Sequence, residues 1–408
     1  MPDFLPFAGL RYRDGEDLNL LCAPPYDVID SDEREALASR SLHNAVRLIL
    51  PTGDEPYAKA ARDLTEWQAS GLLARDPTPR FYGYRMHYSD ETGRSRTTTG
   101  VIGALVLPRA AGEGDVLPHE RTLPKAKSDR LALLRATRAN LDPIWGLTAG
   151  NGLAGPLANT IELAECTDED GVHHVISAVD DSSAIDLVRS IVGSAPLVLA
   201  DGHHRFETAI AYRDEQTQAG ISVIGDEAVM CLVVELDERE LWVQPIHRLF
   251  TGTPSADKLR DRLRPSFTIV EAGPNDAESI QALERSIQDG NSVGLVERDR
   301  IARLVPVANE LSSVQDNLDP AVRDVPSAWF EGLTATVFHG AQPAYQNDAQ
   351  TVASHVNSGG ADTAILLPPV TVYQIRTAAL ARVRMPQKTS FFAPKPRTGM
   401  VFRSNTGQ

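Results

Sequence analysis

The stretch APLVLADGHHRFETAIAYRDE, residues 195–215, constrains the fold more than any other part of the chain. It opens with an apolar run typical of a buried strand. A polar turn, DGHHR at residues 201–205, follows, and the residues after it have helical spacing. We therefore predict a strand that ends at this turn and a helix that begins near His203.

A turn of this kind is suited to binding anions. The first turn of a helix presents free backbone N–H groups and a partial charge of roughly +0.5. Gly202 lets the backbone approach a ligand, and Arg205 offers a fork of donors that matches phosphate oxygens. Two other interpretations stay open: a simple turn capped by Asp201 with packed or solvated histidines, and a metal site, although no HExxH spacing supports it.

Composition narrows the classes of partner. The chain has 408 residues, is 42% hydrophobic and 23% charged, and carries a net charge of −15, so two or three domains are expected and nucleic acid is not expected as a partner. No apolar run approaches the roughly 20 residues that cross a bilayer, and the N-terminus does not resemble a signal peptide. We expect a cytoplasmic protein without a membrane partner; whether it forms a homo-oligomer is open. Cys22, Cys166 and Cys231 are too scattered for a disulfide framework or a zinc site, and we expect buried, reduced thiols.

The pattern of elements predicts an α+β fold. Residues 80–108 indicate a hairpin, 44–50 a strand, 155–166 a helix and 227–250 a second hairpin. We expect residues 1–253 to form a catalytic, phosphate-binding domain and 254–370 a smaller α+β domain. The basic, proline-rich tail, 371–408, is expected to fold back on the first domain and to bring Lys388 near the 201–205 turn.

Longer motifs add a resemblance. The segments are PFAGLRY, APPYDVI, HNAVRLILP, HERTLPKAKSDRLALLRATRANLDPIWGL, ADGHHRFETA and MPQKTSFFAPKPRTGMVF. Together they resemble a family of bacterial and archaeal proteins described as a domain of unknown function. The box LADGHHRFETA is also similar to the strand-to-helix turn of the ParB and sulfiredoxin superfamily, which implies a mixed-sheet core of that type and a nucleoside phosphate at the turn.

The resemblance implies phosphoryl transfer on a small molecule. His203 stands where sulfiredoxins carry a cysteine, so reductive repair of an oxidised cysteine is not expected. The chain shows no DNA-binding segment or basic surface of the kind ParB-type clamping needs. Some superfamily members are kinases of free L-serine, which implies ATP or ADP with Mg²⁺ and a serine-like acceptor.

The candidate site residues fall into three groups. As acid–base groups we predict Asp27, held on a proline-stiffened loop, with Glu120 as second choice, together with His203 and His204. The predicted phosphate-binding and cofactor-binding residues are Asp201, Gly202, His204, Arg205, Lys125, Lys127, Arg130, Lys388 and Lys395. The predicted substrate-binding residues are Tyr26, Asn44, Arg47 and Glu207. Each has an ordinary structural alternative: a turn or cap for the carboxylates, a solvated surface for the lysines, and the wet side of a sheet for Arg47.

Three functions remain open at this point. The first is a nucleotide-dependent phosphotransferase acting, in either direction, on the hydroxyl of a serine-like amino acid. The second is an O-phosphoserine phosphatase, in which water replaces the nucleotide. The third is a sensor that binds a nucleotide or phosphometabolite without turnover. The sequence leaves the acceptor, the choice of ATP or ADP and the metal ligands undetermined.

Overall fold

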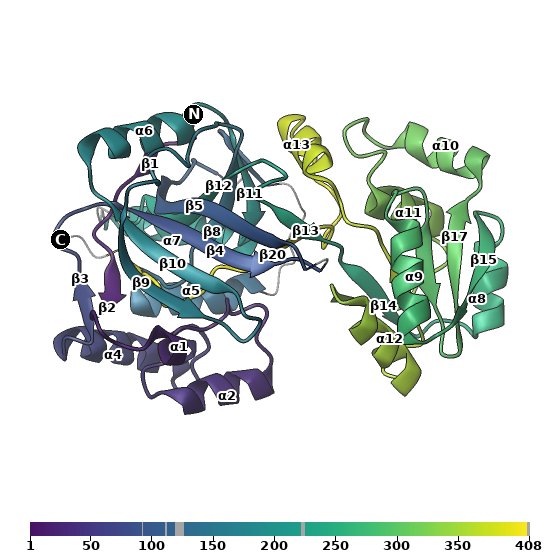
Figure 1. The fold of residues 1–408 in the computed structure, drawn as a ribbon, viewed down its shortest axis with the longest axis horizontal. Coiled ribbons are helices and arrows are strands. Elements are labelled where there is room, and N and C mark those ends of the chain that lie inside the picture. Colours follow the sequence, from purple (N-terminus) through teal and green to yellow (C-terminus); the bar gives the residue numbers. More distant parts are fainter. Residues whose placement is uncertain (92, 111, 119–125, 222–224, 406–408) are drawn as a thin grey trace. The chain divides into compact units, whose positions relative to one another are not determined.

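The computed structural model describes residues 1–91, 93–110, 112–118, 126–221 and 225–405, without the side chains of 126 and 127 (Figure 1). The chain divides into two compact units. The first comprises the described residues of Met1–Pro118, Thr122–Trp242 and Pro394–Gln408, and the second those of Val243–Ala393. The end of the chain is therefore part of the first unit.

A mixed nine-stranded sheet forms the centre of the first unit. Strand β11 is parallel to β6 and antiparallel to β8, while β12 is parallel to β8 and antiparallel to β5. The order is β6 (Val116–Pro118), β11 (Leu197–Asp201), β8 (Ile144–Thr148), β12 (Ala228–Glu235), β5 (Ser95–Val106), β4 (Phe81–Ser89), β10 (His173–Val179) and β9 (Ile161–Thr167), with β1 (Phe4–Leu5) on β5.

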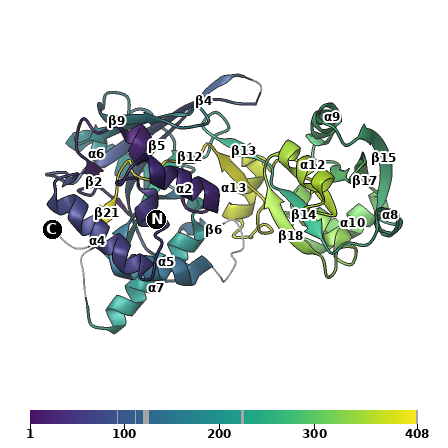
Figure 2. The same cartoon turned by 90° about the horizontal axis from the view of Figure 1, so that it is seen from below.

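Helices pack on this sheet through apolar faces. Val188 and Val192 of α6 (Ser182–Val192) and Phe206 of α7 (His203–Gln218) join a core with Leu197 and Leu199 of β11. Helix α5 (Ala126–Thr137) packs along α7, as Figure 2 also shows. The other helices are α1 (Leu18–Leu21), α2 (Ser31–Arg40), α3 (Val46–Ile49) and α4 (Pro56–Ala69).

The C-terminal segment is built into the first unit by backbone pairing. Thr398 exchanges backbone hydrogen bonds with Ala23, and Phe402 with Leu10. Strand β21 (Arg403–Ser404) pairs with β7 (Ala139–Asn140), and β2 (Leu10–Tyr12) with β3 (Leu73–Arg75). Residues from both ends of the sequence thus lie beside the segment that follows α5.

The second unit is an α+β structure with an antiparallel sheet. Its order is β15 (Phe267–Pro274), β17 (Arg300–Pro306), β16 (Val293–Val296), β19 (Thr363–Leu366), β14 (His247–Thr251) and β18 (Gln342–Gln346). Strand β20 (Phe391–Ala393) pairs with β13 (Trp242–Gln244). Its helices are α8 (Ala256–Leu263), α9 (Ala277–Ile287), α10 (Ala308–Asn317), α11 (Pro326–Thr334), α12 (Ala349–Ser358) and α13 (Val372–Leu380).

The predicted α+β class is confirmed, and so is the 80–108 hairpin, since β4 and β5 pair directly. Three element predictions are wrong. The 44–50 segment contains helix α3 rather than a strand, and 155–166 is a turn leading into β9 rather than a helix. The predicted 227–250 hairpin does not form, because β12 lies between β5 and β8.

Candidate phosphate-binding site at the start of helix α7

The turn between β11 and α7 requires glycine. Gly202 has φ 82° and ψ 27°, a left-handed conformation that L-residues avoid. A Cβ at this position would lie 2.9 Å from Ile144 Cγ2 and 3.2 Å from Arg205 Nε. Because the N-cap residue is glycine, no N-cap side chain covers the backbone donors at the start of this 16-residue helix.

Asp201 is the central anion of the turn. Arg205 Nη2 donates to its Oδ2 at 2.9 Å, and Lys395 Nζ donates to its Oδ1. Burial alone would raise the pKa of Asp201, but Lys395 and then Arg205 outweigh burial and hold that pKa well below its usual value. Two predicted phosphate-binding cations, 190 positions apart in sequence, are therefore held at one carboxylate.

Tyr26 brings two guanidinium groups together. Its ring centroid lies 4.1 Å from Arg130 Cζ and 5.9 Å from Arg205 Cζ, within the range of cation–π contacts. Burial is the main cause that raises the pKa of Tyr26 to about 12, so the phenol is neutral near pH 7. The structure thus brings Arg130 and Arg205, from two separate segments, to the ring of a third predicted residue, Tyr26.

Both arginines are oriented by backbone carbonyls. Arg130 Nη1 donates to Ile49 O at 2.8 Å, and Arg205 Nη1 donates to Pro143 O at 2.7 Å. Arg130 also pairs with its neighbour Asp129. Fixed guanidinium groups lose little side-chain entropy when they bind a ligand, which favours binding of an anion.

Asp142 is a site residue that we did not predict. Its side chain is buried, accepts a hydrogen bond from the Thr398 hydroxyl, and interacts electrostatically with Arg205 and Arg130. Burial outweighs these interactions and raises the pKa of Asp142. Its segment LDPIWGL belongs to one of the longer motifs. The position of Asp142 before a proline at the start of a strand is the feature of the sequence that could have marked it as a site residue.

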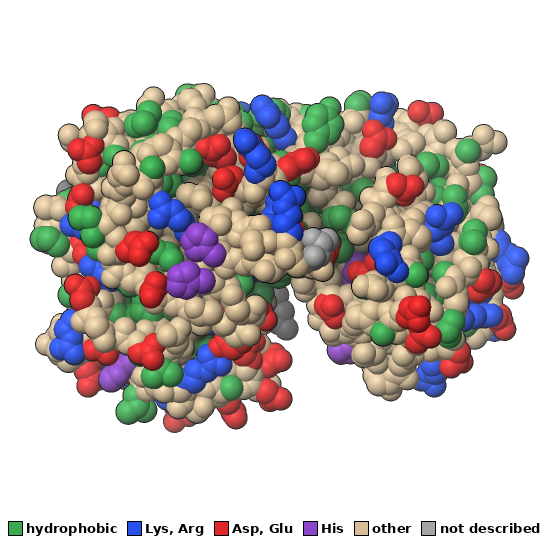
Figure 3. Space-filling model, in the orientation of Figure 1, with side chains coloured by type: hydrophobic (Ala, Val, Ile, Leu, Met, Phe, Trp, Pro, Cys, Tyr) green, Lys and Arg blue, Asp and Glu red, His purple; other side chains and the backbone are tan. Residues whose placement is uncertain are grey.

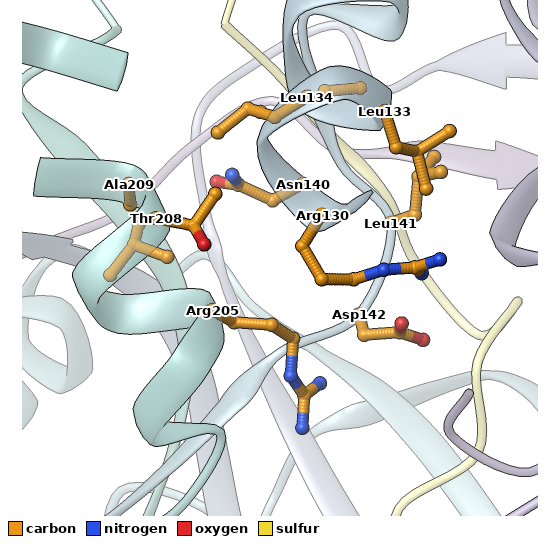
Figure 4. Close-up of a pocket in the computed structure, with 11 residues that line it drawn as sticks. Arg130, Leu133, Leu134, Asn140, Leu141, Asp142, Arg205, Thr208 and Ala209 are labelled. Carbon is orange, nitrogen blue, oxygen red and sulfur yellow. The ribbon is translucent and has the colours of Figure 1, made fainter. Parts of the chain in front are cut away.

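Two cavities border Arg130. One has a volume of about 50 Å³ and is lined by Arg130, Asp142, Arg205 and Thr208 among others; Figure 4 shows their side chains around it. Arg205 Nε and Thr208 Oγ1 are buried there, and the described residues provide neither with a hydrogen-bond partner. The other cavity, of about 530 Å³, lies between α2, α4 and α5, and its size is within the range of small-molecule sites.

Asp27 lies at the edge of this cluster. Its carboxylate is exposed, in the turn that follows the two prolines of APPYD. Burial lowers the pKa of Arg205. The negative charges of Asp142, Asp201 and Asp27, in this order of size, raise that pKa and outweigh burial. The role of Asp27 as a general base therefore stays a prediction.

Asn44 and Arg47 are corrections to the predicted substrate-binding set. Asn44 is 0% exposed, and its amide donates to Leu20 O and Cys22 O and accepts from the backbone of Val46. Arg47 donates to Ser41 O and Ala38 O. Both side chains are engaged in holding local backbone, because the 44–50 segment is helical and packed.

The remaining predicted residues have varied placements. His203, His204 and Glu207 are half-buried on the first turns of α7. Glu120 and Lys125, as well as the side chain of Lys127, lie outside the described residues, so their roles stay predictions. Lys388 belongs to the second unit, and its predicted proximity to the turn also stays a prediction.

The distribution of charged, metal-ligating and apolar side chains bears on which partners the protein can bind. On the face drawn in Figure 3, acidic and basic side chains are scattered over each unit. Within the described ranges, no group of three or more His, Cys, Asp or Glu side chains could hold a metal ion. A search of the same residues finds no helix with the length and apolar character of a membrane span.

The fold is that of an α+β protein with a cluster of charged side chains at the turn between β11 and α7. Residues 4–321 match the family model described as "Protein of unknown function (DUF1015)", and the chain belongs to this family. The predicted resemblance to a family of unknown function is thereby confirmed, whereas the link to ParB and sulfiredoxin stays a prediction. No curated protein matches the chain.

Several solved structures show a weak similarity. A conserved hypothetical protein from Pyrococcus furiosus has a TM-score of 0.36 and 11% identity over 70% of this chain and 90% of its own. A free serine kinase in complex with AMP has a TM-score of 0.35 and 13% identity, with 68% and 84% covered. Truncated SbnI from Staphylococcus aureus has a TM-score of 0.35 and 11% identity, with 70% and 82% covered. We draw no conclusion about activity from similarities at this level.

Proposed function

We propose that this protein binds a nucleotide through its phosphates at the start of α7 and transfers a phosphoryl group to the hydroxyl of a small, serine-like amino acid. One observation carries the proposal: the guanidinium groups of Arg130 and Arg205 both lie within cation–π range of the Tyr26 ring, and Arg205 belongs to the first turn of a helix capped by Gly202. Phosphoryl transfer depends mainly on positive charge and positioning around the phosphate oxygens. This cluster supplies both.

The phosphate groups would lie against Gly202, Arg205 and Arg130. The glycine leaves room for an oxygen near the backbone donors of α7. The buried Nε of Arg205, which lacks a partner among the described residues, is a further donor. Lys395, paired with Asp201 in the absence of ligand, would add a third positive charge.

The rest of the nucleotide fits the larger cavity. That cavity shares Arg130 with the smaller one, so a base and ribose there would place the phosphates toward Tyr26 and Arg205. Ile29, Leu50 and Pro51 supply apolar surface, and Tyr57 an aromatic ring. Mg²⁺ would be bound together with the phosphate oxygens and would neutralise their charge.

The acceptor would bind beside the phosphates, on the side of Asp142. The carboxylate of Asp142 would offer a negative charge to the ammonium group of the amino acid. We assign Asp27 as the base that accepts the hydroxyl proton, because its carboxylate is exposed whereas that of Asp142 is buried. Glu120 remains the second choice.

The test is turnover followed by ³¹P NMR with ATP or ADP, Mg²⁺ and L-serine. We expect O-phosphoserine to form, and Asp27→Asn to lower the rate at least about tenfold with nucleotide affinity nearly unchanged. Asp32→Asn is the matched control, since Asp32 is an exposed carboxylate on α2, and it should retain wild-type turnover. Release of phosphate from O-phosphoserine without a nucleotide would replace the kinase assignment by a phosphatase, and nucleotide binding without turnover would replace it by a sensor.

A further inference from the structure

Three sulfur atoms meet in the interior of the first unit. Cys22 Sγ lies 3.6 Å and Cys166 Sγ 3.7 Å from Met400 Sδ. The two thiols therefore face the same methionine sulfur atom. The exposed fractions are 2% for Cys22, 4% for Cys166 and 2% for Met400. Residues that the sequence separates by up to 378 positions therefore form one sulfur cluster.

The two thiols are chemically unequal. The neighbouring Cys22 thiol is the largest cause that lowers the pKa of Cys166, and the positive charge of Arg397 lowers it further, against burial and the charges of Asp168 and Glu169. The neighbouring Cys166 thiol, with burial, raises the pKa of Cys22. Cys166 is therefore the better nucleophile, with a second thiol already beside it.

We propose that Cys22 and Cys166 are a redox-active pair that closes to a reversible intramolecular disulfide when the protein meets a peroxide. In the first step the Cys166 thiolate attacks hydrogen peroxide, the O–O bond breaks, and a sulfenic acid and hydroxide form. In the second, Cys22 sulfur attacks the Cys166 sulfenic sulfur, the S–S bond forms, and the sulfenic oxygen leaves as water with the Cys22 proton. The hydroxide takes up the proton that Cys166 had released, so two thiols and one peroxide give one disulfide and two waters.

The location of the pair gives the disulfide a structural consequence. Cys22 ends α1 and precedes Ala23, whose backbone pairs with Thr398, and the chain then continues to Tyr26. Gly399 adopts φ 106° and lies so close that a Cβ would be 3.1 Å from Cys22 Sγ. A bond to Cys166 would tie β9 covalently to the segment that carries the Tyr26 ring.

Cys231 provides an internal comparison. It is fully buried on β12, where its thiol contacts Leu232 O. Burial raises its pKa above the ordinary value, and its thiol contacts a backbone carbonyl rather than the sulfur cluster, so it is not placed to form a disulfide with either of the other cysteines. It should remain reduced under conditions that oxidise the other two cysteines.

The experiment treats the whole folded chain with excess hydrogen peroxide, quenches it, denatures it and alkylates the remaining thiols before peptide mass spectrometry. The reduced protein has three free thiols; we expect one after oxidation, a cross-link between the Cys22 and Cys166 peptides, and recovery of three after dithiothreitol. Cys231→Ser should form the same cross-link, and Cys166→Ser should form none. Retention of all three thiols overturns the proposal, as does a sulfinic acid at Cys166, Met400 sulfoxide without the cross-link, or a bond between two chains.

Discussion

Arg205 makes structural contacts and is proposed to bind phosphate, and two substitutions separate these roles. Arg205→Lys keeps the positive charge but loses the fork that reaches both Pro143 O and Asp201 Oδ2, at 2.7 and 2.9 Å. Each such bond to a charged group contributes about 1.5–3 kcal/mol, and a lysine can retain one of them. We expect the free energy of unfolding to fall by about 1.5–3 kcal/mol, which lowers Tm by about 3–12 °C for a unit of this size.

Arg205→Ala should also affect ligand binding. Loss of a charge-assisted contact to phosphate of about 1.5–3 kcal/mol weakens ADP binding about 10- to 150-fold. Arg213 is the matched control, because it lies on the same helix and donates to Pro108 O and Arg109 O. Arg213→Ala should cost stability but leave affinity unchanged.

Differential scanning fluorimetry and isothermal titration calorimetry measure the two effects. Equal stability of Arg205→Lys and wild type would refute the forked contact. Undiminished ADP affinity in Arg205→Ala would show that the arginine only supports the fold, and the phosphate assignment would be wrong.

Three further outcomes are expected. Gly202→Ala should lower stability by at least about 1–2 kcal/mol, because the left-handed backbone is strained and the new Cβ meets Ile144; chemical denaturation measures this, and an unchanged midpoint would contradict the turn geometry. Lys395→Met should lower the free energy of unfolding by about 1.5–3 kcal/mol at pH 6. The depressed pKa of Asp201 stabilises the folded state above the unfolded pKa of about 3.9, and this stabilisation is lost as pH falls toward the folded pKa. The difference in unfolding free energy between the variant and wild type should therefore become smaller below about pH 4, and a difference that does not change with pH would refute the pairing. Asn44→Ala should cost about 2–4 kcal/mol, because it leaves buried backbone groups unpaired, without changing ADP affinity; a change in affinity would restore the substrate role that the structure removes.

The strand–turn–helix at the candidate site could be predicted from the sequence because its signals are local. An apolar run, a glycine and helical spacing follow one another within residues 195–215, and β11, Gly202 and α7 form as predicted. The short polar turn also contains Arg205 and Asp201, which pair with each other in the structure. Each of these features depends on neighbours along the chain, which a single sequence shows directly.

The partners of that turn could not be predicted in detail, because they come from distant segments. Asp142 is hydrogen-bonded to Thr398, 256 positions away, and nothing local marks either residue. The 44–50 segment was predicted as a strand because the apolar run that includes α3 suits a short buried helix as well as a strand. The prediction of a 227–250 hairpin was wrong for a similar reason. The apolar strand β12 is buried between β8 and β5, and the periodicity of a sequence does not indicate which strands are neighbours in a sheet.

The most direct test of the phosphate site compares ADP with adenosine in isothermal titration calorimetry on the wild-type chain with Mg²⁺. If the start of α7 with Arg205 and Arg130 binds phosphates, ADP should bind and adenosine should bind at least about tenfold more weakly, because a single charge-assisted contact of about 1.5–3 kcal/mol corresponds to that ratio or more. Equal binding of the two, or binding of neither, would contradict the account.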